Sequence, residues 1–436
     1  MLFFWKLVAK YRLKHNKEDE NRIKEKFGIT SQFALDKLKK YKEKCNKENK
    51  KPQIIWLHAV SIGESLSVIS FVEEVVKKDY FVLFTTTTLT SSKIIGKKIE
   101  EIELFKSNVV HQFCPYPCLS FFKKLYQTFE PEKVFFVESE IFPSVVKYLS
   151  KKTEIYLINA RMSNHSFKTW KKIRFYISSV LTKYKTIFAS SEIEAEKFRF
   201  LSKNQANIKC FGNLKIENTY KTAQKVVVDK TSNIYAKCEL LKKAVEGEII
   251  ITYGSPHKSE FYYLVWQHCQ LMKKISQNNL AGCFGIFVPR YLEEVAELVK
   301  LFQQNDIEPT LWSDYCGGDL SSVLIINELG CLNYFYNLSD YSVVCGNFAP
   351  DIGGHNPIEP IAFSKPTLVG KYCNKCQDLV DDLLKHNAVI QTETLCDDIS
   401  LLTKNDKDRE MLIKNGEKYI KNNSTTLQNI LKSVFN

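Results

Sequence analysis

Short apolar runs that alternate with polar, lysine-rich helical segments constrain the fold of this chain more than any other feature of its sequence. Such runs predict strands that are buried on both faces, and the segments between them predict helices that connect parallel strands. The alternation therefore predicts an α/β fold in which helices cover both faces of parallel sheets.

The apolar runs fall into two series. The first comprises Ile54–Val60, Tyr80–Phe84, Val109–Phe113, Val134–Val137, Ile155–Ile158 and Ile187–Ala189. The second comprises Ile249–Tyr253, Cys283–Val288, Val323–Ile326, Ser342–Cys345, Pro366–Val369 and Ala388–Ile390. A lysine-rich stretch without clear strand periodicity, residues 216–245, separates them. Because 436 residues are also too many for one compact core, two doubly wound domains are predicted.

Five segments are predicted along the chain: a basic N-terminal segment (1–50), a first domain (51–215), a linker (216–245), a second domain (246–404) and a C-terminal helix (405–436). Two such domains are expected to face each other across a cleft. Ligands of open α/β sheets bind beyond the carboxyl ends of the strands, so the chemistry is expected in the turns that follow the apolar runs.

The formal net charge of +13 is concentrated near the N-terminus. Residues 1–51 hold sixteen Lys or Arg and seven Asp or Glu, behind an aromatic start that is far shorter than the roughly 20 apolar residues needed to span a bilayer. This pattern is typical of a helix lying on an anionic membrane surface, so residues 1–26 are predicted to attach the protein there; a solvated terminus is the alternative. No recognition-helix, zinc-finger or RNA-sheet signature is present, and no nucleic-acid partner is predicted.

Thirteen cysteines without regular spacing are typical of reduced cytosolic thiols. Cys373 and Cys376 form the one C-x-x-C pair, which could begin a zinc site with His386 or Cys396. Those spacings fit no usual zinc module, so incidental thiols are the preferred interpretation and no metal site is predicted.

The first candidate turn contains Ser61, Gly63 and Glu64. Ser61 and Glu64 have capping-box spacing, so Glu64 could serve only to satisfy the backbone donors of a helix start. Alternatively, its carboxylate takes a proton from an attacking hydroxyl, and Gly63 lets a substrate approach the backbone closely. The residues alone leave both interpretations open.

Two carboxylates end the buried strand that begins at Val134. Period-2 geometry places Glu138 and Glu140 on one face, where they could hold a metal, bind sugar hydroxyls or orient another charged group. A solvated strand end is the structural alternative. Arg161 follows the next strand and provides a positive charge nearby, and Lys215 closes the first domain in a similar turn.

The most specific string is Ile352–Pro360, which holds a glycine pair (Gly353, Gly354), His355, Asn356, Pro357 and Glu359. Paired glycines permit unusual backbone angles, and a helix start after them favours a phosphate or carboxylate ligand. Ordinary capping explains Asn356 as the N-cap and Pro357 as the first helical residue, but it does not explain the glycines. Ser255 and His257 follow one strand of the same domain and Arg290 follows another, so all three could face this helix start.

These segments resemble the Kdo transferases of lipopolysaccharide synthesis, where Kdo is 3-deoxy-D-manno-octulosonic acid. The strings HAVSIGE, ESEIFP, INARMSNHSF, GNLK, GSPH, VPR and GGHNPIEP occur in the order seen in that family, and the resemblance extends from about Arg22 to Ala388. It implies a GT-B fold, in which two Rossmann-like domains face a cleft. It also implies the activity, which is inverting transfer of Kdo from CMP-Kdo to a lipid A precursor.

The resemblance assigns roles by position. It makes Glu64 the general base. It places Gly353, Gly354, Asn356 and Glu359 in the donor-nucleotide site, Ser255, His257 and Arg290 near the donor phosphate, and Glu138, Glu140, Arg161 and Lys215 on the acceptor side. The expected partners are CMP-Kdo, the lipid A precursor and the anionic membrane surface, and the expected location is the cytoplasmic face of the bacterial inner membrane, with peripheral or monotopic attachment.

The chain departs from the family pattern at Pro256, Tyr291 and Asn327–Cys331, where contacts with the donor are expected. The only Asp-x-Asp lies in the polar tail, at Asp406 and Asp408, so neither a divalent cation nor a cofactor is predicted. Two alternatives stay open: another GT-B sugar-nucleotide enzyme, and a catalytically degenerate relative that only binds lipid.

Overall fold

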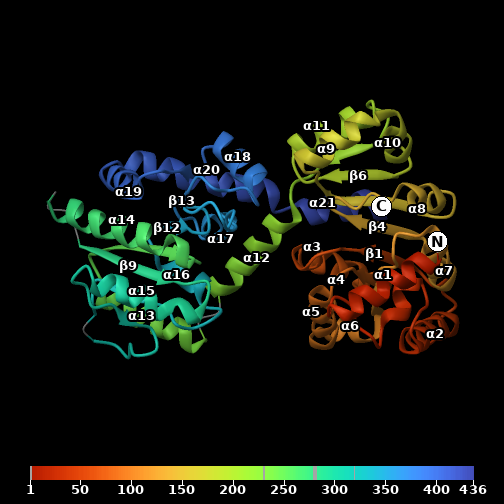
Figure 1. Ribbon diagram of the computed structural model, residues 1–436, viewed down its shortest axis with the longest axis horizontal. Helices are drawn as coiled ribbons and strands as arrows, with labels where there is room; N and C mark the ends of the chain where they lie inside the picture. The colour runs from red at the N-terminus through yellow and green to blue at the C-terminus, as the bar shows by residue number, and fades with distance from the viewer. Residues whose placement is uncertain (1, 229–230, 278–281, 319) are drawn as a thin grey trace. The chain divides into compact units, whose positions relative to one another are not determined.

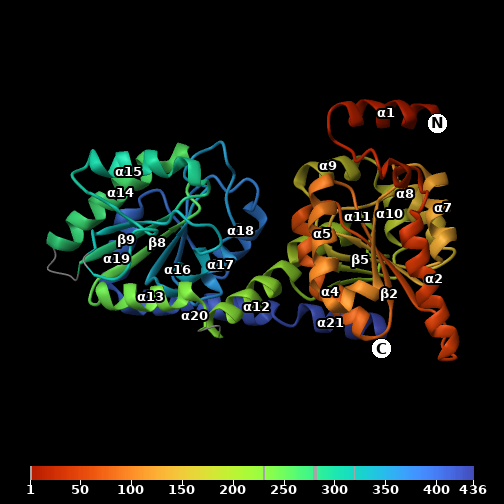
Figure 2. The ribbon, with the colours of Figure 1, turned by 90° about the horizontal axis from the view of Figure 1, so that it is seen from below.

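A computed structural model describes residues 2–228, 231–277, 282–318 and 320–436 of the chain. Within these ranges the strands form two parallel sheets of seven strands each. The chain divides into two compact units: unit 1 comprises Met1–Lys215 and Thr425–Asn436, and unit 2 comprises Ile216–Ser424. In each unit, helices pack on both faces of the sheet (Figures 1 and 2).

Unit 1 contains the first seven strands. They are β1 (Ile54–His58), β2 (Phe81–Thr86), β3 (Val109–Phe113), β4 (Lys133–Val137), β5 (Glu154–Ala160), β6 (Thr186–Ala189) and β7 (Ile208–Cys210), in the order β3-β2-β1-β4-β5-β6-β7. The helices of this unit are α1 (Leu2–Lys14), η1 (Ile23–Phe27), α2 (Gln32–Lys47), α3 (Ile62–Ser67), α4 (Ile69–Lys77), α5 (Leu89–Glu101), α6 (Glu103–Asn108), α7 (Leu119–Phe129), α8 (Pro143–Leu149), α9 (Asn164–Lys172), α10 (Arg174–Leu181), α11 (Glu192–Leu201) and α21 (Thr426–Phe435).

Alternate residues of each strand in unit 1 enter two separate cores, as expected for a sheet covered on both faces. In β1, Ile54 and Trp56 join the core that contains α7 and α8, whereas Ile55 and Leu57 join the core that contains α4. The C-terminal helix α21 also belongs to the second core, so the end of the chain returns to complete unit 1. Burial of each large apolar side chain in these cores stabilises the sheet by about 1.5–3 kcal/mol.

Unit 2 contains the remaining strands. They are β8 (Ile249–Gly254), β9 (Cys283–Val288), β10 (Thr310–Leu311), β11 (Val323–Ile325), β12 (Tyr341–Val344), β13 (Thr367–Val369) and β14 (Ile390–Gln391), in the order β10-β11-β9-β8-β12-β13-β14. Its helices are α12 (Leu214–Val228, which begins in unit 1), α13 (Asn233–Ala244), α14 (Lys258–Gln277), η2 (Leu292–Glu294), α15 (Val295–Gln303), α16 (Leu332–Leu338), α17 (Ile358–Ile361), α18 (Gln377–Lys385), α19 (Leu395–Lys404) and α20 (Asp406–Asn423).

The predicted α/β fold class with two parallel sheets is confirmed, because each predicted apolar run overlaps a strand. The pattern did not predict β7 and β10, which are short and incompletely buried. Residues 216–245, predicted as a linker, lie mostly in α12 and α13 and belong to unit 2. The predicted C-terminal helix is two helices, α20 in unit 2 and α21 in unit 1.

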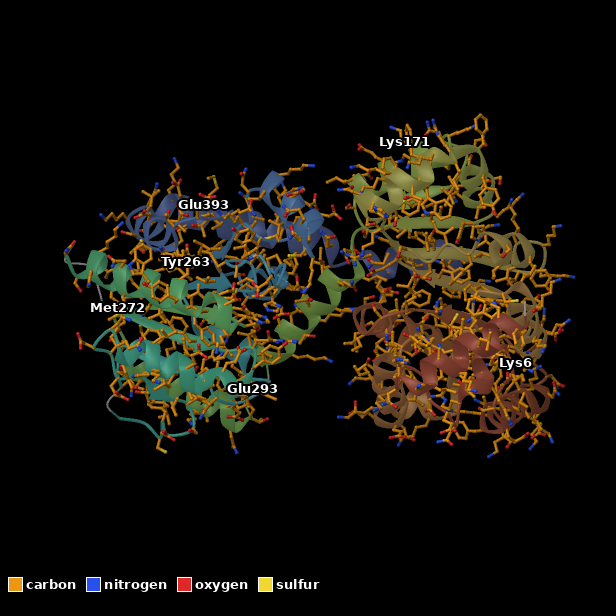
Figure 3. All side chains as sticks on the ribbon, viewed as in Figure 1. Lys6, Lys171, Tyr263, Met272, Glu293 and Glu393 are labelled. Carbon is orange, nitrogen blue, oxygen red and sulfur yellow. The ribbon has the colours of Figure 1, made fainter. Side chains whose placement is uncertain are left out.

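Helix α1 packs on unit 1 through a small apolar cluster, in which Ala9 is buried and Trp5 and Val8 are partly buried. The ring of Trp5 stacks on Tyr116 with the centroids 5.0 Å apart. Four large side chains of the helix, Phe3, Phe4, Leu7 and Tyr11, are more than half exposed. Lys6 in this helix is labelled in Figure 3. No helix among the described residues is long and apolar enough to cross a bilayer.

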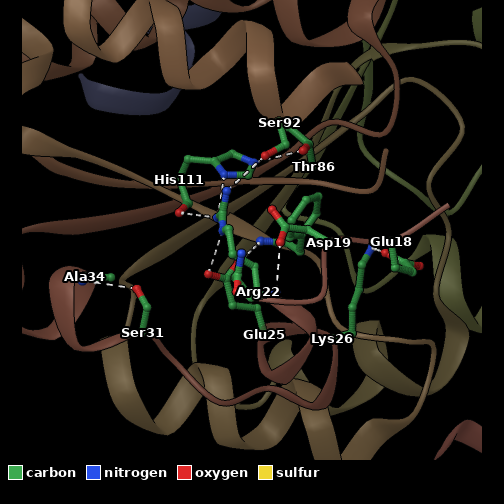
Figure 4. Close-up of polar contacts among 12 residues, drawn as sticks. Glu18, Asp19, Arg22, Glu25, Lys26, Ser31, Ala34, Thr86, Ser92 and His111 are labelled. Atoms are coloured by element: carbon green, nitrogen blue, oxygen red, sulfur yellow. Dashed lines mark hydrogen bonds and ion pairs between the residues drawn. The ribbon is translucent and has the colours of Figure 1, made fainter. Parts of the chain in front are cut away.

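Three charged side chains that follow α1, by contrast, are buried in unit 1: Glu18, Glu25 and Lys26 (Figure 4). The buried ammonium of Lys26 lies 3.6 Å from the carboxylate of buried Glu18 and donates to the carbonyl of Thr87 at 2.8 Å. Glu25 accepts from Arg22 and also from the N–H of Phe113 at 2.7 Å, at the end of edge strand β3. Of the residues 1–26 that were predicted to attach to a membrane, Glu18, Glu25 and Lys26 are therefore buried in unit 1.

Candidate functional site

In both units the candidate residues lie where the strand order reverses. β1 lies between β2 and β4, and β8 lies between β9 and β12, so successive connections leave these strands in opposite directions. Open α/β sheets have a ligand crevice at this point, beyond the carboxyl ends of the strands. Glu64 follows β1 and Glu138 follows β4 in unit 1, whereas Ser255 follows β8 and Gly353 follows β12 in unit 2. Each unit therefore gathers its own group of candidates.

Glu64 occupies the capping position that its spacing predicts. Ser61, the N-cap of α3, accepts from the N–H of Glu64 at 3.3 Å, and its hydroxyl donates to Glu64 Oε1 at 2.9 Å. Glu64 Oε2 accepts from the N–H of Val60 at 2.8 Å. Glu64 is nevertheless only half-buried.

The surroundings of Glu64 also favour proton transfer. Burial raises the pKa of Glu64 and the nearby Glu138 carboxylate adds to the rise, while the Val60 N–H, the Ser61 hydroxyl and Lys215 oppose it. A carboxylate whose pKa is raised holds a proton more readily than an ordinary glutamate. Capping and general-base catalysis are thus compatible in one side chain.

Glu138 is a buried carboxylate held between two cations. It lies 2.6 Å from Arg161 Nε and 2.6 Å from Lys215 Nζ, and only 3% of the residue is exposed. Its φ of +59° turns the chain sharply as β4 ends, a conformation that costs energy outside glycine. Glu138 was predicted to hold a metal, bind sugar hydroxyls or orient another charged group. Its two ion pairs favour the third role, in which it orients Arg161 and Lys215.

Two asparagines fix the position of Lys215. Asn159, with φ +51° near the end of β5, accepts from the N–H of Leu214 at 3.1 Å, and Asn213 accepts from the N–H of Lys215 at 2.9 Å. A Cβ added at Gly63 would lie 3.8 Å from Lys215 Nζ, so the ammonium lies beside the start of α3. Sequence reasoning gave neither asparagine a role, although both follow predicted strands.

Glu140 differs from Glu138 in having no hydrogen-bond or ion-pair partner in the part of the chain that the structure describes, although it is partly buried. Burial raises the pKa of Glu140 to about 7, and the Glu64 and Glu138 carboxylates add to the rise. The unit 1 site therefore holds three neighbouring carboxylates, of which Glu138 is paired with two cations and Glu140 is about half protonated at pH 7.

We predict that Glu140→Gln stabilises the protein at pH 8. The folded state binds the Glu140 proton more tightly than the unfolded state, so the wild type loses stability as the pH rises from about 4.5 to about 7. The amide has no charge to bury, so the variant should be ~1–3 kcal/mol more stable at pH 8 and equal to the wild type at pH 4.5. Urea denaturation at both pH values measures this difference, and an equal gain at pH 4.5 would contradict the titration of Glu140.

In unit 2, the turns after β8, β9 and β12 are joined by backbone contacts. Ser255, with φ +56°, donates its N–H to the carbonyl of Val288 at 2.9 Å, and the N–H of Arg290 donates to the carbonyl of Pro256 at 3.0 Å. Glu260, fully buried at the start of α14, accepts from the N–H of His257 at 3.0 Å and from two N–H groups after β12. Glu260 was not among the predicted site residues.

His257 and His355 form a stacked pair across these turns. Their Nε2 atoms are 2.9 Å apart and their rings are 13° from parallel. Burial lowers the pKa of His257, and burial lowers the pKa of His355 to about 4. One neutral imidazole must donate to the other, so the pair contributes hydrogen-bonding groups near pH 7 while the positive charge comes from elsewhere.

The glycine string adopts the backbone that its composition predicts. Gly353 and Gly354 have φ values of +92° and +97°, and a Cβ on Gly354 would lie 2.8 Å from Cys376 Sγ. Cys376 donates to the carbonyl of His355 at 3.5 Å and Cys373 to that of Gly370 at 3.2 Å, so both thiols of the C-x-x-C pair contact the backbone here. The described residues contain no group of three or more side chains that could hold a metal ion.

The helix after the glycines differs from the prediction. α17 has only four residues, its N-cap is Pro357 rather than Asn356, and Asn356 Oδ1 already accepts from the N–H of Ile358 at 3.1 Å. A helix this short has a small dipole, so it adds little to anion binding. Glu359 lies in this helix, where burial raises its pKa to about 6 against the opposing effect of Arg290.

Two exposed cations provide the charge that this short helix lacks. Arg290 follows β9, and Lys375 lies in the loop after β13, with its N–H donating to the carbonyl of Gly353 at 2.8 Å. Both lower the pKa of His355, which places them close to the histidine pair. Neither forms an ion pair with a carboxylate in the described ranges, so the site has a positive charge that suits a phosphate. Lys375 was not predicted.

The residues that depart from the family pattern make hydrogen bonds and ring contacts within unit 2. Pro256 keeps its carbonyl as the acceptor for Arg290, and the ring of Tyr291 lies edge-on to His257 with the centroids 5.5 Å apart. In the Asn327–Cys331 loop, Glu328 accepts from the indole N–H of Trp312 at 3.1 Å. These substitutions leave Arg290 and His257 in place.

Comparison with known proteins identifies the family. The family model of 3-deoxy-D-manno-octulosonic-acid transferases matches residues 21–218. A 3-deoxy-D-manno-octulosonic acid transferase of Rickettsia bellii is 26% identical over 435 residues, covering 97% of this chain and 94% of that protein. The transferase of that name from Chlamydia trachomatis serovar D is 25% identical over 391 residues, covering 87% of this chain and 85% of that protein. The chain belongs to the Kdo transferase family.

As a Kdo transferase, the protein is a glycosyltransferase, and solved structures agree with its fold. UDP-GlcNAc 2-epimerase from Neisseria meningitidis matches with a TM-score of 0.58 at 14% identity, over 88% of this chain and 99% of that chain. A glycosyltransferase from Rickettsia africae matches with a TM-score of 0.56 at 12% identity, over 88% of this chain and 98% of that chain. These similarities support the GT-B type of α/β fold and carry no argument about substrate.

Proposed function

We propose that this Kdo transferase transfers Kdo from CMP-Kdo to a hydroxyl group of a lipid A precursor, with inversion at the sugar carbon and without a metal ion. The observation that carries the proposal is the geometry of Glu64, a half-buried carboxylate with a raised pKa at the switch point of unit 1. A degenerate relative that only binds lipid would not need a half-buried carboxylate with a raised pKa at this position.

The donor residues of unit 2 act on the leaving group. Breaking the bond between the sugar carbon and the phosphate oxygen leaves CMP with additional negative charge on its phosphate. Arg290 and Lys375 can neutralise that charge, and His257 and the backbone at Gly353 and Gly354 can donate hydrogen bonds. We assign Ser255 to the same phosphate turn, and Asn356 and Glu359 to the nucleotide side of the glycine string.

The acceptor residues of unit 1 act on the nucleophile. As the acceptor oxygen bonds to the sugar carbon, its proton passes to Glu64, and attack on the face opposite the phosphate inverts that carbon. Lys215 and Arg161, both anchored by Glu138, are placed to contact the phosphates or hydroxyls of the lipid. Glu138 already holds two cations, which favours a positioning role over metal ligation.

The direct test is incubation of the purified protein with CMP-Kdo and a tetra-acylated lipid A precursor in excess EDTA, followed by mass spectrometry of the lipids. We expect the acceptor to gain the mass of one or more Kdo residues while CMP is released. Loss of activity in EDTA that magnesium restores would overturn the metal-free mechanism. Preference for a UDP-sugar would favour another GT-B enzyme, and lipid binding without CMP release would favour the degenerate relative.

We also propose that the protein works at the anionic cytoplasmic face of the inner membrane, in peripheral or monotopic attachment, and that α1 contributes to binding. Deletion of residues 2–14 should weaken binding to vesicles containing phosphatidylglycerol. It also removes Arg12, which pairs with Glu18, but Glu18 keeps its ion pair with Lys26 and Glu25 keeps its bond from Arg22, so unit 1 should still fold. Binding of the intact protein should weaken as salt rises. Cosedimentation with anionic and neutral vesicles measures both effects, and equal binding to the two would contradict the proposal.

A further inference from the structure

A second surface of unit 1, the α9–α10 surface, has the composition of a membrane-contacting face. We define it by Phe175, Tyr176 and Ile173 together with Lys168, Lys171, Lys172, Arg174 and Lys203. Phe175 is 83% exposed, and Ile173 and Tyr176 are nearly half exposed, which is unusual for neighbouring large apolar side chains. Helix α9 has no fully buried residue, and although its Phe167 and Trp170 pack partly against the core of unit 1, that packing does not account for its exposed lysines.

The sequence that forms most of this surface is basic and contains no acidic residue. Residues 161–191 contain seven Lys or Arg and no Asp or Glu. On α4 and α5, by contrast, lysines pair with acids one turn away, as Lys77 does with Glu74 and Lys98 with Glu101. In the described structure none of the basic residues that define the α9–α10 surface forms an ion pair, so their charge is available to an external anion.

The cations and the aromatic rings are interleaved. Lys203 Nζ lies 3.4 Å from the centroid of the Phe175 ring, Lys147 Nζ lies 4.5 Å from that of Tyr176, and the Arg174 guanidinium lies 4.1 Å from that of Phe200. Aromatic side chains enter the boundary between headgroups and acyl chains, while lysines pair with lipid phosphates above it. This interleaving matches a lipid surface better than a single anionic ligand.

The location of the α9–α10 surface also favours a lipid bilayer as its partner. α1 and α9 lie on the same side of unit 1, and Lys171 of α9 is labelled in Figure 3 (Figure 2). The loop before α9 carries Arg161, whose Nε lies 2.6 Å from Glu138 in the acceptor-side site. A bilayer in contact with α9 would therefore lie next to the residues assigned to the lipid acceptor.

We infer that the α9–α10 surface docks on an anionic lipid bilayer as a second contact, separate from α1. The choice of a lipid surface rests on the proposed function, because the acceptor is a membrane lipid. Basic side chains near an anionic surface each strengthen binding, so loss of two lysines and one inserted ring should weaken binding roughly tenfold or more.

The test compares the full chain carrying Lys171→Gln, Lys172→Gln and Phe175→Ser with a matched control on unit 2. The control carries Lys407→Gln, Lys418→Gln and Tyr262→Ser, which remove two exposed lysines and one exposed ring from that unit. We expect the α9–α10 variant, and not the control, to bind phosphatidylglycerol vesicles roughly tenfold or more weakly. The residual vesicle binding of the protein lacking residues 2–14 should be lost when the three substitutions are added.

Activity assays separate this inference from the proposed function. The α9–α10 variant should transfer Kdo normally to acceptor dispersed in detergent and poorly to acceptor embedded in vesicles, because only the second assay needs docking. Equal loss in both assays, or unchanged vesicle binding, would overturn the inference. Binding to RNA that is tighter than to vesicles and is lost in the variant would also overturn it, in favour of a nucleic-acid surface.

Discussion

Replacement of Glu64 by glutamine is expected to lower turnover by roughly 10²–10⁴-fold with little change in stability. Glutamine is isosteric and keeps an oxygen to accept from the N–H of Val60, and its amide can donate to the Ser61 hydroxyl in place of the bond that Ser61 now donates. The helix cap is therefore preserved, whereas the proton acceptor is lost. Turnover with CMP-Kdo and the lipid acceptor, CMP affinity and the melting temperature together measure the two roles.

Ser61→Ala is the matched control for Glu64→Gln. It removes the N-cap hydroxyl and one hydrogen bond to Glu64 but leaves the carboxylate, so stability should fall by about 1 kcal/mol and turnover should change little. Loss of that hydrogen bond should raise the pKa of Glu64 further, which moves the acid limb of the pH–rate profile to higher pH. Near-normal transfer by Glu64→Gln would end the base assignment, and Glu140 would become the next candidate.

The sequence predicted the sheets well because buried parallel strands leave a local signal. Continuous apolar runs coincide with the central strands, whereas β7 and β10 lie at sheet edges and are incompletely buried, so no apolar run marks them. The amphipathic pattern of the C-terminal tail predicts that a helix buries one face but not against which unit. Contact of α21 with the core of unit 1 is a long-range feature that no local pattern contains.

The candidate site was predicted in part for a topological reason. Glu64, Glu138 and Arg161 follow central strands, and the carboxyl ends of parallel strands meet at one edge of the sheet. Lys375 gives no comparable signal, because it is one of 62 Lys and Arg residues and lies after a three-residue strand. Glu260 resembles any acid in the first turn of a helix, and only the structure shows that it is fully buried.

Loss of the Glu260 carboxylate is the second large effect that we expect. Its Oε2 accepts from the N–H groups of His257 at 3.0 Å and Gly346 at 2.9 Å, and its Oε1 accepts from Phe348 at 2.9 Å. Each buried donor left without a partner costs about 1–3 kcal/mol. Glu260→Ala should therefore lower the free energy of unfolding of unit 2 by ~3–5 kcal/mol, while Glu260→Gln, which keeps one acceptor oxygen, should lower it by ~1–2 kcal/mol.

Hydrogen exchange followed by mass spectrometry separates this effect from other causes of lost activity, because it resolves the two units of the chain. Protection should fall in the turns after β8 and β12 and spread through unit 2, while unit 1 exchanges as in the wild type. Donor affinity should fall together with this protection, because the same two turns carry His257 and the backbone before the glycine string.

Glu410→Ala, which removes an exposed carboxylate paired with Lys414, is the control and should change stability by less than about 0.5 kcal/mol. If Glu260→Ala were as stable as this control, the carboxylate would not be what joins the two turns, and the stacked histidines would be the next candidate for that role.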